Sequence, residues 1–124
     1  MAAILLVDDA RTVRLITGRV CKSMGFQVLE AENGAVALSV VREHPEVDVI
    51  LLDWHMPEMD GLTFLRALRG DPTLTQPYVV MCTTQNEIAD ISAALESGAN
   101  EYVMKPFTEE ILREKLLEAA VVHH

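Results

Sequence analysis

Short apolar runs alternate with helix-patterned segments five times along this chain. Strands are predicted at residues 3–8, 26–31, 47–52, 78–82 and 102–104, because these runs are short, unbroken and rich in β-branched residues. Helices are predicted at residues 10–24, 35–43, 62–69, 87–97 and 109–121 from apolar spacing and flanking start and stop signals. Because right-handed crossovers dominate β–α repeats, the pattern predicts an α/β fold: a doubly wound parallel sheet with helices on both faces.

Two of the predicted helices carry an apolar face, and the face of the fourth helix is expected to point inward. In the first helix this face consists of Val13, Ile16, Val20 and Met24. In the fourth helix it consists of Ile88, Ile91, Ala94 and Leu95. Gly25 ends the first helix in a position that tolerates a positive φ, and Thr108 is expected to cap the last helix.

Four of the predicted strands run into polar residues that suit phosphoryl chemistry. These residues are Asp8 and Asp9, Asp53, Thr83, and Lys105. Because the carboxyl ends of parallel strands lie along one edge of a sheet, we expect these side chains to meet in one crevice. A lone aspartate at such a position is often a helix N-cap, but a cap accounts for only one member of the first pair.

Three carboxylates in a partly desolvated crevice repel one another, which favours protonation or a bound cation. Hard oxygen ligands without a cysteine or histidine cluster favour Mg²⁺, with Mn²⁺ as a substitute. His55 is close in sequence, but a lone histidine in a turn is more often a surface residue. An aspartate beside Mg²⁺ can attack phosphorus to form an acyl phosphate, with Lys105 and Thr83 donating to the phosphoryl oxygens.

Charge and cysteine content exclude several classes of protein. The net charge of −9, from 19 acidic and 10 basic side chains, argues against direct DNA binding, which requires a basic surface. No apolar run approaches the ~18 residues of a membrane span, and the N-terminus lacks the pattern of a signal peptide. Cys21 and Cys82 form no disulfide framework. We therefore expect a cytoplasmic, monomeric protein without membrane insertion.

The polar residues at the strand ends match a known family in order and setting. Asp8-Asp9, Asp53, Thr83 and Lys105-Pro106 resemble the pattern of two-component response-regulator receiver domains, and residues 53–61 and 98–107 resemble the CheY-like, chemotaxis type. The resemblance implies a flavodoxin-like five-stranded sheet of order 2-1-3-4-5. It also implies one receiver domain over residues 1–122 without an effector domain. Two histidines at a chain end serve no evident local purpose, so His123-His124 are interpreted as the remnant of an affinity tag.

The resemblance assigns the catalytic roles. By this resemblance, Asp53 would accept phosphate from the phosphohistidine of a histidine kinase. Asp8, Asp9, Asp53 and the backbone carbonyl of His55 would hold Mg²⁺. Thr83 and Lys105 bind the phosphoryl group, and the Lys105–Pro106 peptide bond is expected to be cis.

The resemblance also implies a switch. Thr83 moves toward the phosphoryl group and vacates space into which Tyr102 rotates, which alters the face built from the fourth helix, fifth strand and fifth helix. A downstream protein, with a flagellar switch protein as the leading case, is expected to bind this face, and a phosphatase is a further expected partner. An alternative for Tyr102 is an amphipathic aromatic side chain half-buried at a strand edge.

Three positions depart from the usual chemotaxis pattern: His55, Thr84 and Gln85. In the family, side chains at the positions of His55 and Gln85 flank the water path to the phosphoryl group, so these departures bear on phosphoryl lifetime. Thr84 is bulkier than the usual small residue and is expected to restrict Tyr102.

Three other functions stay open at this point. The chain could be a phosphorelay intermediate or a regulator of a kinase or enzyme. It could be a degenerate receiver that acts as an unphosphorylated interaction domain. A Mg²⁺-dependent phosphohydrolase would need a second acid/base carboxylate, which neither Trp54 nor His55 supplies. We expect a switch that undergoes Mg²⁺-dependent autophosphorylation and autodephosphorylation, and not an enzyme that turns over external substrates.

Overall fold

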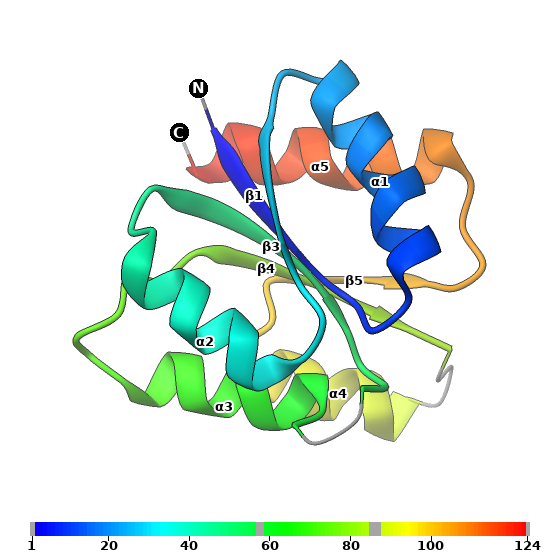
Figure 1. The fold of residues 1–124 in the computed structure, drawn as a ribbon. Coiled ribbons are helices and arrows are strands. Elements are labelled where there is room, and N and C mark those ends of the chain that lie inside the picture. Colours follow the sequence, from blue (N-terminus) through cyan, green and yellow to red (C-terminus); the bar gives the residue numbers. More distant parts are fainter. Residues whose placement is uncertain (1, 57–58, 85–87, 124) are drawn as a thin grey trace.

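Five parallel strands form one sheet in the order β2-β1-β3-β4-β5, as predicted (Figure 1). The computed structural model describes residues 2–56, 59–84 and 88–123. The strands are β1 (Ala3–Val7), β2 (Gln27–Ala31), β3 (Val47–Asp53), β4 (Tyr78–Thr83) and β5 (Glu101–Met104). The helices are α1 (Arg11–Ser23), α2 (Gly34–Glu43), α3 (Gly61–Gly70), α4 (Ile88–Glu96) and α5 (Glu109–His123). Where residues are described, the bounds differ from the predicted ones by two residues at most.

The three inner strands account for the unbroken apolar runs of the sequence. All residues of β1 and β4 are buried, and in β3 only Asp48 is partly exposed. A central parallel strand is covered by helices on both faces, so both of its sides must be apolar. The outer strands β2 and β5 are partly exposed, which agrees with their edge positions.

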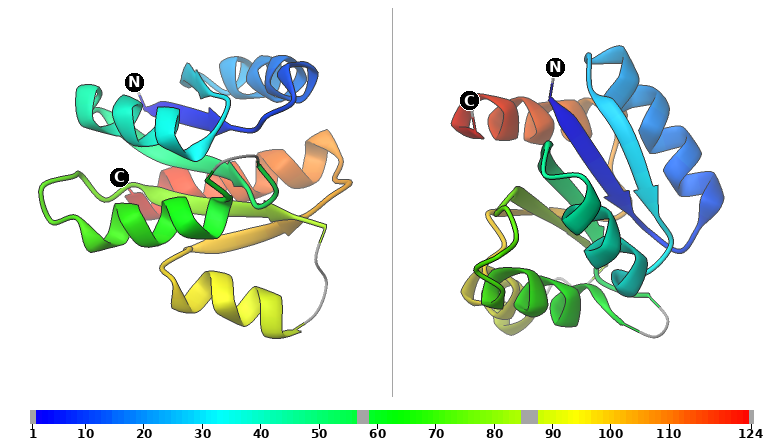
Figure 2. Two further views of the ribbon diagram at one scale, coloured as in Figure 1. Left: turned by 60° about the horizontal axis from the view of Figure 1, so that its bottom comes forward. Right: turned by 60° about the vertical axis from the view of Figure 1, so that its left-hand side comes forward.

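Each face of the sheet has its own hydrophobic cluster because successive strand residues point to opposite sides. On one face, Leu5 and Val7 of β1 pack with residues of α2, α3 and α4. On the other face, Ile4 and Leu6 pack with residues of α1 and α5. Figure 2 shows this three-layer arrangement, with α1 and α5 on the side of the sheet opposite to α2 and α3.

Helix ends follow the residues that favour them. The side chain of Asn33 accepts a hydrogen bond from the Val36 N–H, and Asp60 accepts one from the Thr63 N–H. Thr108 accepts from the Ile111 N–H at 3.1 Å, so the predicted cap of α5 is confirmed. Gly25, which follows α1, has a φ of 94°, as predicted.

The apolar positions along α1 differ in burial. Val13 and Ile16 are 36% and 57% exposed, and the residues of α1 that are buried are Thr17, Gly18, Val20 and Cys21. A Cβ atom at Gly18 would lie 3.7 Å from both Leu6 and Val28, so the helix lies close to the sheet at this small residue. Val13 and Ile16 instead line a surface pocket with Pro106 and Phe107.

The predicted inward face of α4 is wrong at Leu95. Ala94 is 1% exposed and Ile91 is partly buried, whereas Leu95 is 44% exposed. Leu95 lies one position, or about 100°, around the helix from Ala94, which faces the sheet. The side chain of Ile88 lies outside the described part. None of the helices in the described part of the chain has the length and apolar content that crossing a membrane requires.

Candidate functional site

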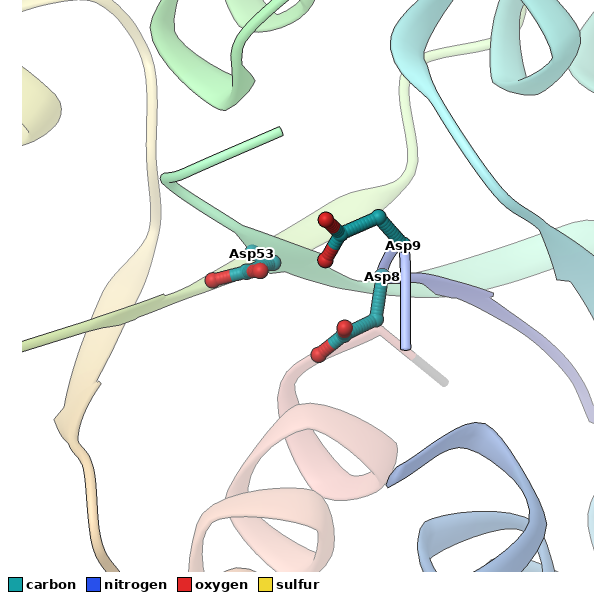
Figure 3. A group of neighbouring side chains, drawn as sticks. All are labelled: Asp8, Asp9 and Asp53. Atoms are coloured by element: carbon teal, nitrogen blue, oxygen red, sulfur yellow. The ribbon is translucent and has the colours of Figure 1, made fainter. Parts of the chain in front are cut away.

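Three aspartates come together beyond the carboxyl ends of β1 and β3. Asp53 is the last residue of β3, and Asp8 and Asp9 directly follow β1. One carboxylate oxygen from each of the three side chains lies within 4.8 Å of the others. Figure 3 shows the three side chains gathered at this point. Asp8 and Asp53 are buried, while Asp9 is exposed. The crevice expected from the strand ends is therefore present for all three carboxylates.

Lys105, which follows β5, reaches the same cluster. Its Nζ lies 3.1 Å from Asp8 Oδ2 and 3.2 Å from Asp53 Oδ1. Its backbone N–H donates to the carbonyl of Thr83 at 2.9 Å, which joins the ends of β4 and β5. The Lys105–Pro106 peptide bond is cis, as expected from the sequence. The ammonium is thus directed to the point where the two buried carboxylates meet.

The turn after β1 holds the Asp8 carboxylate in place. Oδ1 of Asp8 accepts a hydrogen bond from the Ala10 N–H at 2.9 Å, and the backbone N–H of Asp8 donates to the Ala31 carbonyl at 3.1 Å. The N-cap of α1 is Ala10, so neither aspartate is the cap. The N-cap alternative for Asp8 and Asp9 is therefore wrong.

The loop after β3 packs closely on Asp53. The Trp54 N–H donates to the Cys82 carbonyl at 2.9 Å, and the Gly61 N–H donates to the Trp54 carbonyl at 3.0 Å. A Cβ atom at Gly61 would lie 2.4 Å from the Asp53 carbonyl oxygen, so only glycine fits at the start of α3. This close approach fixes the backbone from which the Asp53 side chain projects.

Burial and charge shift the pKa values at the site. Burial raises the pKa of Asp53, and the neighbouring Asp8 adds to the rise, while Lys105 opposes it. Burial alone would lower the pKa of Lys105, but the charges and hydrogen bonds of Asp53 and Asp8 outweigh this effect and raise it. Three carboxylates face one ammonium, so the cluster carries an excess of negative charge that a cation would neutralise.

Comparison with known proteins identifies the family. Residues 4–117 match the response regulator receiver domain family. This chain belongs to that family. The receiver is 38% identical over 114 residues to the chemotaxis protein CheY1 of Helicobacter pylori, covering 91% of this chain and 92% of that protein. It is 39% identical over 114 residues to the chemotaxis protein CheY of Pseudomonas aeruginosa, covering 91% of each.

The fold of the receiver is also that of a solved chemotaxis protein. CheY4 of Vibrio cholerae superposes with a TM-score of 0.88 at 29% identity, covering 96% of this chain and 98% of that one. The chain is thus a CheY-like receiver domain of a two-component system, a signalling switch rather than a catalytic enzyme. Receiver domains bind Mg²⁺ at an acidic pocket and interact with histidine kinases and downstream targets.

The other residues singled out in the sequence lie around the aspartates in different settings. Thr83 is buried at the end of β4, and Tyr102 on β5 is partly buried. His55 and Thr84 are exposed. Gln85 lies outside the described residues, so its place beside the site stays a prediction.

One residue that contacts the site was not predicted from the sequence to do so. Arg14, on α1, donates from Nη1 to the backbone carbonyl of Asp8 and from Nε to Glu30 Oε1. The sequence does place a basic residue shortly after the paired aspartates, which could have indicated a contact with them. A lone arginine on a helix, however, is normally a solvated surface residue.

Proposed function

We propose that this receiver is switched by phosphorylation of Asp53, with the phosphohistidine of a histidine kinase as the donor. The observation that carries the proposal is the position of Lys105 Nζ, 3.2 Å from Asp53 Oδ1 and 3.1 Å from Asp8 Oδ2, within the cluster of three carboxylates. A nucleophile, a cation-binding set and a phosphoryl-oxygen donor are thereby combined at one sheet edge.

In the proposed reaction, a carboxylate oxygen of Asp53 attacks the phosphorus of the donor. The new O–P bond forms as the P–N bond to the imidazole breaks, and the electrons of that bond return to the imidazole nitrogen, which takes a proton from solvent. Lys105 donates a hydrogen bond to one phosphoryl oxygen and the hydroxyl of Thr83 donates to another. Autodephosphorylation is the attack of water on the same phosphorus, with Asp53 as the leaving group.

The carboxylates of Asp8, Asp9 and Asp53 and the backbone carbonyl of His55 would hold Mg²⁺, with Mn²⁺ as a substitute. Carboxylate and carbonyl oxygens are the hard ligands that Mg²⁺ prefers, so the donor set fits the ion. When bound, the ion supplies positive charge that lowers the repulsion between the carboxylates and the incoming phosphoryl oxygens. Asp8 also orients Lys105, since the two side chains are within hydrogen-bond distance.

We further propose that the output is a protein contact. Movement of Thr83 toward the phosphoryl group would let Tyr102 rotate and change the face formed by α4, β5 and α5. Because the relatives are chemotaxis proteins, a flagellar switch protein is the leading partner for this face. The proposal also assigns the receiver to residues 1–122 and places it in the cytoplasm.

Phosphorylation by acetyl phosphate and Mg²⁺, followed by mass spectrometry of the intact protein, tests the reaction. We expect one phosphoryl group per chain, which does not form when Mg²⁺ is chelated before the donor is added and is absent in Asp53→Asn. Asp48→Asn is the matched control, because Asp48 lies on the same strand as Asp53 but near its opposite end. If Asp53→Asn takes up phosphate with the same yield as the control, the assignment of the acceptor is wrong.

The partner is tested separately by binding. Beryllofluoride with Mg²⁺ mimics the phosphoryl group, and a flagellar switch peptide should bind the treated protein more tightly than the untreated one. Substitution of Tyr102 by alanine should reduce this difference without changing phosphorylation of Asp53. Equal binding with and without beryllofluoride would argue for one of the other outputs.

A further inference from the structure

The side chain of Arg14 joins the aspartate turn to the edge strand of the sheet. It is 13% exposed and pairs through Nε with Glu30 Oε1 at 2.9 Å, while Nη1 donates to the Asp8 carbonyl. We propose that Arg14 is a positioning residue for the cation site, held in place by Glu30. This inference rests on the proposed function, since it concerns the Mg²⁺ that Asp8 and Asp9 would bind.

The turn lacks the usual side-chain cap that would fix it. The N-cap of α1 is Ala10, whose side chain has no oxygen to accept a hydrogen bond from the helix N-terminus. Arg14 reaches back by one turn from within α1 and provides a different restraint. Its backbone N–H also donates to the Ala10 carbonyl at 3.1 Å, so the side chain projects from an ordered turn of helix.

Two neighbouring residues of β2 hold both sides of the Asp8 backbone. The Ala31 carbonyl accepts the Asp8 N–H at 3.1 Å, and Glu30 holds the arginine that donates to the Asp8 carbonyl. Asp8 is 8% exposed, so loss of the donor would leave a largely buried carbonyl poorly paired. The peptide units around Asp8 would then rotate more freely, and with them the two carboxylates that they carry.

Arg14 also forms part of the wall of the site. It lines a cavity of about 20 Å³ together with Asp8, Asp53 and Lys105. On its other side it lines a larger surface pocket with Glu30 and Glu32. The arginine therefore contributes both to the space beside the buried carboxylates and to the surface over β2.

Electrostatics and positioning predict opposite effects of removing this arginine. If Arg14 acted only as a charge, its loss beside a cation site would strengthen Mg²⁺ binding, because a repulsive positive charge is removed. If it positions Asp8 and Asp9, its loss weakens Mg²⁺ binding, as is usual for groups that orient metal ligands. The sign of the change thus distinguishes the two roles.

The test is the Mg²⁺ dissociation constant, measured by Trp54 fluorescence and by calorimetry on the whole protein. Arg14→Met should weaken Mg²⁺ binding roughly 10-fold, the lower end of the range for orienting groups. Arg113→Met is the matched control, since Arg113 also pairs with a glutamate and donates to a second oxygen, but on α5. This control should leave the dissociation constant within about 2-fold, a factor small beside that range.

A double-mutant cycle separates positioning from a structural role. Glu30→Gln should weaken Mg²⁺ binding in the unsubstituted protein but not in Arg14→Met, because Glu30 acts through the arginine. A general loss of stability, which urea unfolding in chelator measures, would not make the effect of Glu30→Gln depend on the presence of Arg14. Should Arg14→Met fail to fold, Arg14→Lys replaces it, because lysine keeps the charge but cannot reach both acceptors at once.

Unchanged or tighter Mg²⁺ binding in Arg14→Met, or in Arg14→Lys where that variant is used, overturns the positioning role. An effect of Glu30→Gln that persists without the arginine does so as well. Failure of the proposed function is recognised differently: the unsubstituted protein would then show no Mg²⁺ binding that depends on Asp9. The two hypotheses therefore fail in separate measurements.

Discussion

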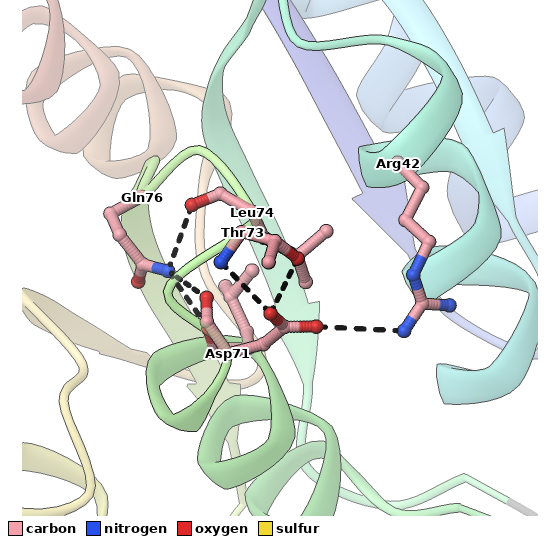
Figure 4. Close-up of polar contacts among 6 residues, drawn as sticks. Arg42, Asp71, Thr73, Leu74 and Gln76 are labelled. Carbon is pink, nitrogen blue, oxygen red and sulfur yellow. Dashed lines mark hydrogen bonds and ion pairs between the residues drawn. The ribbon is translucent and has the colours of Figure 1, made fainter.

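Asp53 lies where the strands end, and Asp71 lies in the connection that leads from α3 to the start of β4. We call these two regions the Asp53 edge and the Asp71 edge. The pKa values of the two aspartates shift in opposite directions. Burial, with the charge of Asp8, raises the pKa of Asp53 despite the nearby Lys105. The hydroxyl and backbone N–H of Thr73, at 2.6 and 2.9 Å, lower the pKa of Asp71. Figure 4 shows both hydrogen bonds. The Asp53 carboxylate is desolvated beside another carboxylate, whereas the Asp71 carboxylate is partly exposed and accepts hydrogen bonds from Thr73.

Hydrogen bonds also connect the other segments near Asp71. Arg69, near the end of α3, donates to the carbonyls of Pro77 and Gly98 and to the side chains of Gln76 and Asn100. These contacts join α3 to the starts of β4 and β5. The comparison suggests a division: substitutions at the Asp71 edge should change stability, and substitutions at the Asp53 edge should change cation binding.

Arg69→Met should have the largest effect of those predicted here. The substitution keeps part of the apolar stem but removes the donors to two backbone carbonyls and two side chains. Because hydrogen bonds to charged groups contribute more than neutral ones, we expect a loss of about 3 kcal/mol in the free energy of unfolding. Urea unfolding measures the loss, and Mg²⁺ affinity should stay unchanged.

Arg66→Met is the control for Arg69→Met. Arg66 lies on the same helix and donates to Ser97 Oγ at 3.3 Å, on the exposed surface. Its replacement should cost less than about 0.5 kcal/mol. Equal losses for the two variants, or a large change of Mg²⁺ affinity in Arg69→Met, would contradict the division between the edges.

Gly98→Ala should give the next largest effect. Gly98 has a φ of 111°, and a Cβ atom there would lie 2.6 Å from Arg69 Cγ. Backbone strain together with displacement of the arginine should lower the free energy of unfolding by about 2 kcal/mol. In Arg69→Met the same substitution should cost less, because a methionine without the hydrogen bonds of the arginine can move away from the Cβ atom, while the strained φ remains.

Gly70→Ala is the matched control for the glycine. Gly70 is the last residue of α3, and a Cβ atom there meets no atom of the described residues within 4 Å. Alanine at this position should leave stability unchanged or raise it by up to about 1 kcal/mol. Thermal unfolding of both variants at one pH compares them directly, and similar losses would argue against a special role of Gly98.

Asp9→Asn tests the edge that carries the site. The substitution removes one exposed carboxylate from the cluster, and Mg²⁺ affinity should fall about 10-fold, which equals about 1.4 kcal/mol of binding free energy. In chelator, the free energy of unfolding should change by less than about 1 kcal/mol, because the lost charge only repelled its neighbours. Glu43→Gln, which removes an exposed charge at the end of α2, is the control for net charge. A large loss of stability in Asp9→Asn would contradict the division.

The two edges differ in how far the sequence predicts them. The Asp53 edge was predictable because buried parallel strands are visible as apolar runs, and the residue after each run must lie at that edge. Asp8, Asp9 and Asp53 were placed in this way, and the structure brings them within 4.8 Å. Their roles came from the resemblance to receiver domains.

The Asp71 edge was not predictable in the same way. Arg69 contacts residues from Gln76 to Asn100, and no periodic pattern marks an arginine that bonds to the carbonyls of two different connections. The exposure of Val13 was not predictable for a related reason. Apolar spacing identifies a helix face, but it does not reveal whether the helix lies close to the sheet along its whole length.

The smallest effects concern the pH dependence of stability, where the two aspartates should again differ in sign. The folded state raises the pKa of Asp53 above its ordinary value of 3.8, so its contribution is present below that pH and is lost as pH rises through the raised pKa. The folded state lowers the pKa of Asp71, so its contribution is present above pH 3.8 and is lost as pH falls through the lowered pKa.

Urea midpoints in chelator, measured from about pH 2 to about pH 7, test these signs because both carboxyl groups titrate in this range. Asp53→Asn should remove a decrease in stability above pH 3.8, and Asp71→Asn should remove a decrease below pH 3.8. Asp53→Asn should also bring the pKa of Lys105 closer to its ordinary value, since the charge of Asp53 helps to raise it. If both substitutions flatten the same side of the profile, the two edges do not differ in the way that their hydrogen bonds and burial indicate.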